Sequence, residues 1–93
     1  MRLSKFEIKT IKETVAKYDD QADVWLFGSR TDLNKLGGDI DLIILSQKLT
    51  AEKSMYIRQD LWDELGFQRI DIIIDKDENK PFIKIALEGG IKL

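Results

Sequence analysis

Residues 22–45 have the sequence ADVWLFGSRTDLNKLGGDIDLIIL, and they contain two of the three strands that we predict. The first six residues are rich in β-branched and aromatic side chains, which predicts a strand that stops at Gly28-Ser29. Residues 30–38 are polar and end in two glycines, as is typical of a loop or a short helix followed by a turn. Residues 40–45 are apolar except for Asp41, which indicates a second strand buried on both faces.

The residues on either side of this stretch predict helices. Ser4 and Glu7 have the spacing of a capping box at the start of a helix that runs to about residue 17. Thr50 is the expected cap of a second helix, and Met55 and Trp62 are among the residues expected to give it apolar contacts, with an exposed patch for a partner as the alternative. Gly66 stands where a glycine commonly ends a helix.

The rest of the chain completes the predicted element order. Residues 69–75 predict a third strand, and Pro81 opens a last helix because proline is tolerated in the first turn. The order is therefore helix, strand, strand, helix, strand, helix. We expect an α/β fold, with a small mixed sheet of about three strands flanked by about three main helices, in a single domain over residues 1–93.

Composition excludes several kinds of chemistry. The 93 residues include no cysteine and no histidine, which excludes disulfides, thiolate zinc sites, cysteine nucleophiles and histidine-based triads. Any reaction must then use carboxylates, hydroxyls, Lys or Arg, together with a hard metal ion. The net charge is −2, whereas domains that bind long nucleic acid usually have a basic excess, so we do not expect such a partner.

The hydrophobic pattern gives an expectation about location. No apolar run approaches the ~18 residues that a membrane helix needs, so no membrane span is expected. The first five residues, MRLSK, lack the apolar core of a signal peptide. We therefore expect a cytoplasmic protein.

Two acidic residues at the start of the second predicted strand indicate a metal site. Asp39 and Asp41 project from the same face, because strand residues two apart lie about 6.6 Å from each other on one side. Two unpaired carboxylates beside an apolar strand are costly, and a divalent cation removes that cost. Mg²⁺ prefers oxygen ligands and commonly shares its shell with substrate phosphates. A site for two ions needs a third acid from a neighbouring strand, and Asp71 is the candidate.

Other roles are possible for these acids. Asp71 could pair with Arg69 or Arg58, and Asp75 lies on the same face of the strand four residues later. We favour Asp71 because apolar residues flank it, whereas Asp75 begins a charged turn. Similarly, Asp39 could be a turn residue, and Asp41 could pair with a nearby Lys.

An anion site is expected beside the acids. Gly28 lets the backbone come close to a ligand, and a short helix after it would direct free N–H groups at an anion. The Ser29 hydroxyl can bond a phosphate oxygen, and Arg30 can bind phosphate through two N–H groups unless it forms a surface ion pair. A strand-ending turn is the structural alternative for Gly28-Ser29. Trp25 and Phe27 are expected in the core.

Gly28-Ser29-Arg30, followed by Asp39-Ile40-Asp41-Leu42 and later by Asp71, resembles the signature of the nucleotidyltransferases related to DNA polymerase beta. Within that superfamily the chain looks most like the minimal nucleotidyltransferases, the MNT group. The resemblance covers essentially the whole chain, including the ending from Pro81 to Leu93. It implies a nucleotidyltransferase-like fold.

The resemblance also implies an activity and a set of roles. Gly28 and Ser29 would hold a triphosphate, with Arg30 as a further contact, and Asp39 and Asp41 would bind the metal ions, Mg²⁺ in two copies. The third acid, which in the family can help to activate the attacking hydroxyl, would be Asp71. The implied reaction transfers a nucleoside monophosphate, AMP from ATP in some relatives, to an acceptor hydroxyl.

The same resemblance implies a partner. Proteins of the MNT group commonly act as antitoxins of helical HEPN proteins, and some modify a HEPN tyrosine with AMP. We therefore expect a HEPN-type partner protein. The alternative is a non-catalytic MNT-fold binding module that neutralises its partner by contact.

Overall fold

The computed structural model describes residues 3–28 and 40–93, which contain three helices and four strands. In chain order they are α1 (Lys5–Tyr18), β1 (Asp23–Phe27), β2 (Ile40–Leu45), α2 (Lys53–Leu65), β3 (Ile70–Asp75), α3 (Pro81–Glu88) and β4 (Ile91–Lys92). The predicted α/β class and the predicted order of the first six elements are confirmed. The fourth strand was not predicted.

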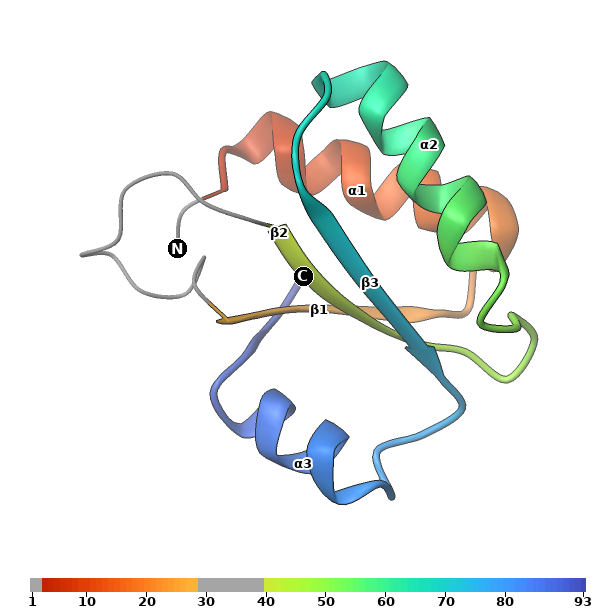
Figure 1. Cartoon of the computed structure of the whole chain (residues 1–93), viewed down its shortest axis with the longest axis vertical. Helices are drawn as coiled ribbons and strands as arrows, with labels where there is room; N and C mark the ends of the chain where they lie inside the picture. The colour runs from red at the N-terminus through yellow and green to blue at the C-terminus, as the bar shows by residue number, and fades with distance from the viewer. Residues whose placement is uncertain (1–2, 29–39) are drawn as a thin grey trace.

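The strands form one mixed sheet in the order β3-β2-β1-β4. β1 pairs antiparallel with both β2 and β4, whereas β2 and β3 run parallel. In Figure 1, α1 and α2 lie on one side of the sheet and α3 lies on the other. β2 is thus an interior strand covered on both faces, and Ile40, Leu42, Ile43 and Ile44 have no exposed surface, as predicted from the apolar run.

Alternation along the strands divides the side chains between two clusters. The even-numbered residues Leu42 and Ile44 of β2 belong to the cluster that includes Ile57 and Leu61 of α2. The odd-numbered residue Ile43 belongs to a smaller cluster with side chains of α3. Because side chains alternate between the faces of a strand, odd-numbered residues of the first three strands face α3.

The start of α1 follows the sequence pattern. The Ser4 hydroxyl accepts a hydrogen bond from the Glu7 N–H at 3.1 Å, and the Ser4 N–H donates to the Glu7 carboxylate at 2.9 Å. This capping box satisfies two of the N–H groups that a helix start leaves without intrahelical partners. Ile11 and Val15 are buried on the inner face of the helix.

The start of α2 differs from the prediction. The helix begins at Lys53 with Glu52 as its N-cap, and Thr50 contributes only a carbonyl, which accepts from the Lys53 N–H at 3.0 Å. Met55 is 64% exposed, so its expected core contacts are wrong. The reason is the helical period, since Met55 is two positions, or about 200°, from the buried Ile57.

Other helix boundaries agree with the sequence. Gly66 ends α2 with a φ of 90°, and Pro81 occupies the first turn of α3. After α3 the chain returns to the sheet, where Ile91 and Lys92 pair with Leu26 and Trp25. Two residues are too few to show a period, so β4 could not be recognised from sequence. None of the helices that the structure describes is long and apolar enough to span a membrane.

A hydrogen bond between side chains ties α1 to α2. The Tyr18 hydroxyl donates to the Asp60 carboxylate at 2.5 Å. This bond and partial burial raise the pKa of Tyr18 to about 12. The folded protein therefore keeps this proton at a pH where an unfolded tyrosine has lost it.

We predict that Tyr18→Phe lowers the free energy of unfolding by about 1 kcal/mol near neutral pH, because one hydrogen bond to a carboxylate is lost. The difference from wild type should shrink as the pH rises from 10 towards 12, since the folded pKa is raised and its stabilisation is lost through that window. Urea unfolding at several pH values measures this difference in the free energy of unfolding. Tyr56→Phe, at a 58% exposed tyrosine whose effect on the pKa of Tyr18 is the smallest of the causes, is the control and should change the unfolding free energy much less than Tyr18→Phe. A constant difference across this pH range would contradict the assignment.

Candidate functional site

The strand register brings two of the predicted acids together. Asp41 is the second residue of β2, and it pairs with Phe27 on one side and with Asp71 on the other. All three residues have odd numbers and therefore face α3. Neighbouring strands lie about 4.8 Å apart, so Asp41 and Asp71 are adjacent at the end of the sheet where β2 and β3 begin.

Gly28 makes room for the Asp41 carboxylate. It follows β1 directly and has a φ of 77°, in a region that side chains rarely allow. A Cβ atom placed on Gly28 would lie 2.6 Å from Oδ2 of Asp41, which is closer than real Cβ contacts allow. The sequence suggested that Gly28 permits close approach of a ligand, and the structure shows that it permits close approach of Asp41.

Asp71 has an ion-pair partner directly before its own strand. The Nε atom of Arg69 lies 3.6 Å from Oδ2 of Asp71, with the Asp71 side chain 49% exposed. This is one of the two pairings considered from sequence, while Arg58 instead lies over the ring of Trp62 at 5.5 Å. A pair between exposed groups is screened by water and contributes little to stability. Asp71 therefore remains accessible from solvent.

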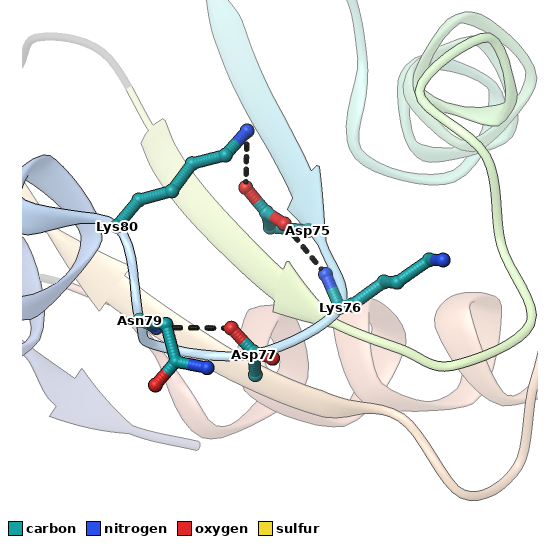
Figure 2. A network of polar contacts seen from close by, with 5 residues as sticks. All are labelled: Asp75, Lys76, Asp77, Asn79 and Lys80. Atoms are coloured by element: carbon teal, nitrogen blue, oxygen red, sulfur yellow. Dashed lines mark hydrogen bonds and ion pairs between the residues drawn. The ribbon is translucent and has the colours of Figure 1, made fainter.

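Asp75, the alternative third acid, is the last residue of β3 and bonds the turn that follows. Its carboxylate lies 3.0 Å from Nζ of Lys80 and accepts from the backbone N–H of Lys76 at 2.8 Å, as Figure 2 shows. The hydrogen bonds from Lys80 and from this backbone N–H hold the pKa of Asp75 below its usual value. In the register Asp75 pairs with Leu45, at the far end of β2 from Asp41. This geometry favours Asp71 over Asp75 as the neighbour of Asp41.

The remaining predicted site residues, Ser29, Arg30 and Asp39, lie outside the described residues. Their roles stay predictions. Among residues 3–28 and 40–93, no group of three acidic side chains is close enough to hold a metal ion. Because the predicted set of three includes Asp39, the described part of the chain contributes two of its members.

The described donors fit a hard cation. Asp41 and Asp71 offer carboxylate oxygens, which Mg²⁺ prefers to nitrogen or sulfur ligands. The space that Gly28 leaves holds the Asp41 carboxylate at the end of β1, directly before the predicted anion-binding residues.

A second polar cluster lies at the opposite end of the sheet. The buried carboxylate of Asp19 accepts hydrogen bonds from the Ser46 hydroxyl at 2.6 Å and from the Gln21 N–H at 3.0 Å, and these bonds lower its pKa. The same hydroxyl accepts from the N–H groups of Lys48 and Leu49. A hollow of about 660 Å³ opens beside the cluster. These polar groups bond one another and hold the turns after α1 and β2.

Comparison with known families agrees with the geometry. The model of the family described as "Polymerase beta, Nucleotidyltransferase" matches residues 9–93, which include every element of the sheet and the pair Asp41 and Asp71. A search of the curated proteins finds no match.

We predict that Gly28→Ala moves the Asp41 carboxylate, because the new methyl group would occupy its place. Gly66→Ala is the matched control, since Gly66 has a φ of 90° but nothing within 4 Å of the new Cβ. Both variants should lose about 1–2 kcal/mol of unfolding free energy from backbone strain. Only Gly28→Ala should shift the ¹³C resonance of the Asp41 carboxyl in NMR spectra.

One result would contradict this prediction for Gly28→Ala. If the two variants leave the Asp41 carboxyl resonance equally unchanged, Gly28 does not control the position of that side chain. Gly89→Ala, at a glycine with a negative φ and open space around its Cβ, gives the baseline for a harmless substitution.

Proposed function

Because the chain belongs to the polymerase beta nucleotidyltransferase family, we propose that it transfers a nucleoside monophosphate from a nucleoside triphosphate to an acceptor hydroxyl. ATP is the proposed donor and pyrophosphate the second product. The observation on which this rests is the adjacency of Asp41 and Asp71 on parallel strands, next to the glycine that ends β1. Two carboxylates beside a predicted phosphate-binding segment suit a triphosphate that is bound together with a metal ion.

Each residue has a proposed role. Asp41 and Asp71, with Asp39, would hold Mg²⁺, in two copies. Bound there, Mg²⁺ would neutralise triphosphate charge and stabilise the attacking and leaving oxygens. Ser29 and Arg30 would bind the phosphate oxygens from the segment after Gly28.

The proposed transfer forms one bond to phosphorus, breaks another and moves one proton. The acceptor oxygen forms a bond to the α-phosphorus, and the bond from that phosphorus to the bridging oxygen of the β-phosphate breaks. The hydroxyl proton passes to Asp71, which is partly exposed and can be reached by an acceptor from solvent. The α3 face of the sheet orients the reactants, because Asp41 and Asp71 project from it.

The acceptor is proposed to be a protein. The resemblance to the MNT group suggests a HEPN-type helical partner, a tyrosine hydroxyl as acceptor, AMP as the group transferred, and an antitoxin role in the cytoplasm. The net charge of −2 supports a protein acceptor over long nucleic acid. A non-catalytic module that neutralises the partner by contact is the alternative.

We predict that Asp41→Asn lowers the transfer of label from α-³²P-ATP to the co-expressed partner at least about 100-fold, because a negative metal ligand and its charge are lost. Asp75→Asn is the matched control, because Asp75 faces the same side of the sheet as Asp41 but lies at the other end of the β2 and β3 pair. It should retain most of the labelling. Circular dichroism would establish that both variants are folded.

The results separate the two functions. Equal labelling by wild type and Asp41→Asn would end the proposal of a transferase site at Asp41. If Asp41→Asn loses labelling but still protects cells from the partner, binding rather than catalysis neutralises the partner. Loss of protection together with labelling supports the catalytic antitoxin.

A further inference from the structure

The outer edge of β3 is open. β3 is the last strand in the order β3-β2-β1-β4, and no strand of the described residues pairs with its outer side. The six residues of the strand, IDIIID, include no proline and no lysine, and Ile72, Ile73 and Ile74 are only partly buried. Exposed strand edges of this kind pair with other chains unless charge, proline or a covering element protects them.

The hydrogen-bonding groups of that edge can be assigned from the register. The carbonyl of Arg69 accepts a bond from Ile40 of β2 at 3.0 Å, and the carbonyl of Asp75 accepts one from Ser46, directly after β2, at 2.9 Å. Since backbone groups alternate along a strand, the odd-numbered residues of β3 bond to β2. Ile70, Ile72 and Ile74 therefore direct their N–H and C=O groups away from the sheet.

An apolar strip continues this edge onto α2, and we define it as Met55, Trp62 and Phe67. Asp60 bonds Tyr18 of α1, and Trp62, two positions or about 200° further round the helix, lies on the opposite flank. Met55 shares that flank because it is seven positions from Trp62. The Trp62 ring stacks on that of Phe67 at 4.6 Å between centroids, and Phe67 is 85% exposed.

The Trp62 end of this strip lies beside the segment that leads into β3, because the Trp62 Nε1 atom donates to the carbonyl of Gln68 at 2.6 Å, whereas Met55 lies on the side of α2 that faces away from the sheet. Trp62 and Phe67 of the α2 strip are thus neighbours of the start of the open strand edge. Apolar side chains beside unpaired backbone groups are typical of an interface between proteins.

We propose that a second copy of this chain covers the surface, with the two β3 strands pairing antiparallel about a twofold axis at Ile72. A twofold axis perpendicular to the sheet keeps each face on the same side, so an even-numbered residue must oppose an even-numbered one. Centred at Ile72, the pairing uses all three outward-directed residues, Ile70, Ile72 and Ile74, and forms about six backbone hydrogen bonds. The result is one continuous sheet across both copies.

The charged residues at this edge favour the same strand register. Centred at Ile72, Arg69 of each copy opposes Asp75 of the other, so opposite charges meet across the strands in addition to the ion pairs with Asp71 and Lys80 within each copy. Centred at Ile73, Asp71 would oppose Asp75, and centred at Asp71 two identical acids would meet. Both alternatives place like charges directly opposite each other, which is destabilising. The charge pattern and the backbone pattern therefore agree on one arrangement.

This self-complementarity is the reason for choosing a second copy as the occupant. One short segment, residues 69–75, supplies the donors, the acceptors and both charges of each pair, as a twofold interface requires. The twofold axis also brings the α2 strips of the two copies towards each other on the α1 and α2 face. Asp41 and Asp71 project from the other face, so the inference does not depend on the proposed transferase activity.

The test begins with sedimentation of the isolated full-length chain from micromolar to sub-millimolar concentrations, where we expect a reversible dimer. Arg69→Asp should raise the dissociation constant at least about tenfold, because two attractive pairs become repulsive. Lys84→Asp, at an exposed lysine of α3, makes the same change of charge away from the edge and should behave as wild type. The double variant Arg69→Asp/Asp75→Arg should restore dimerisation, because the pairs are exchanged rather than lost.

A second measurement avoids charge altogether. The chain has no cysteine, so Ile72→Cys places the only thiol of each copy at the twofold axis, with about 5.5 Å expected between the two Cα atoms. A short thiol cross-linker should join two copies, and Lys84→Cys should not be joined. A monomer at every concentration would overturn the inference. Equal effects of Arg69→Asp and Lys84→Asp, or a dimer in which Ile72→Cys fails to cross-link, would do the same.

Discussion

The pairing of β2 with β1 on one side and with β3 on the other is the constraint on which the rest of the molecule depends. β2 is the only strand of the described residues that has both a parallel and an antiparallel neighbour, and four of its six residues have no exposed surface. A shift of register by one residue would turn Asp41 into the apolar cluster under α1 and α2. The burial of Leu42 and Ile44 on that face therefore determines that Asp41 faces α3.

The two faces of the sheet differ in their side chains, one being mainly apolar and the other including the acidic pair. The face under α1 and α2 contains the larger apolar cluster and provides most of the burial. The face under α3 is less completely covered, because α3 is short and packs mainly around Ile43. Asp41 and Asp71 lie at the end of that face where β2 and β3 begin, and the Asp71 side chain is 49% exposed. The larger apolar cluster and the candidate site residues thus lie on opposite faces of the sheet.

Local patterns predicted much of this structure because they depend on near neighbours. The capping box of Ser4 and Glu7 and the proline that opens α3 act within a single turn of helix. The apolar run of β2 predicted burial on both faces. The sequence left open whether Met55 is in the core or exposed, because that depends on which flank of α2 meets the sheet. It did not predict β4, because that strand depends on a partner more than sixty residues away.

The candidate site shows the same division. Residue types and spacing alone were enough to single out Gly28, Asp41 and Asp71 and to indicate phosphate and metal chemistry, because that chemistry needs carboxylates and a glycine before a polar segment. Tertiary structure decided that Asp71 rather than Asp75 is the neighbour of Asp41, and that Gly28 holds the space for that carboxylate. Both facts follow from strand register and backbone distance, which join residues far apart in the chain and leave no mark in the local sequence.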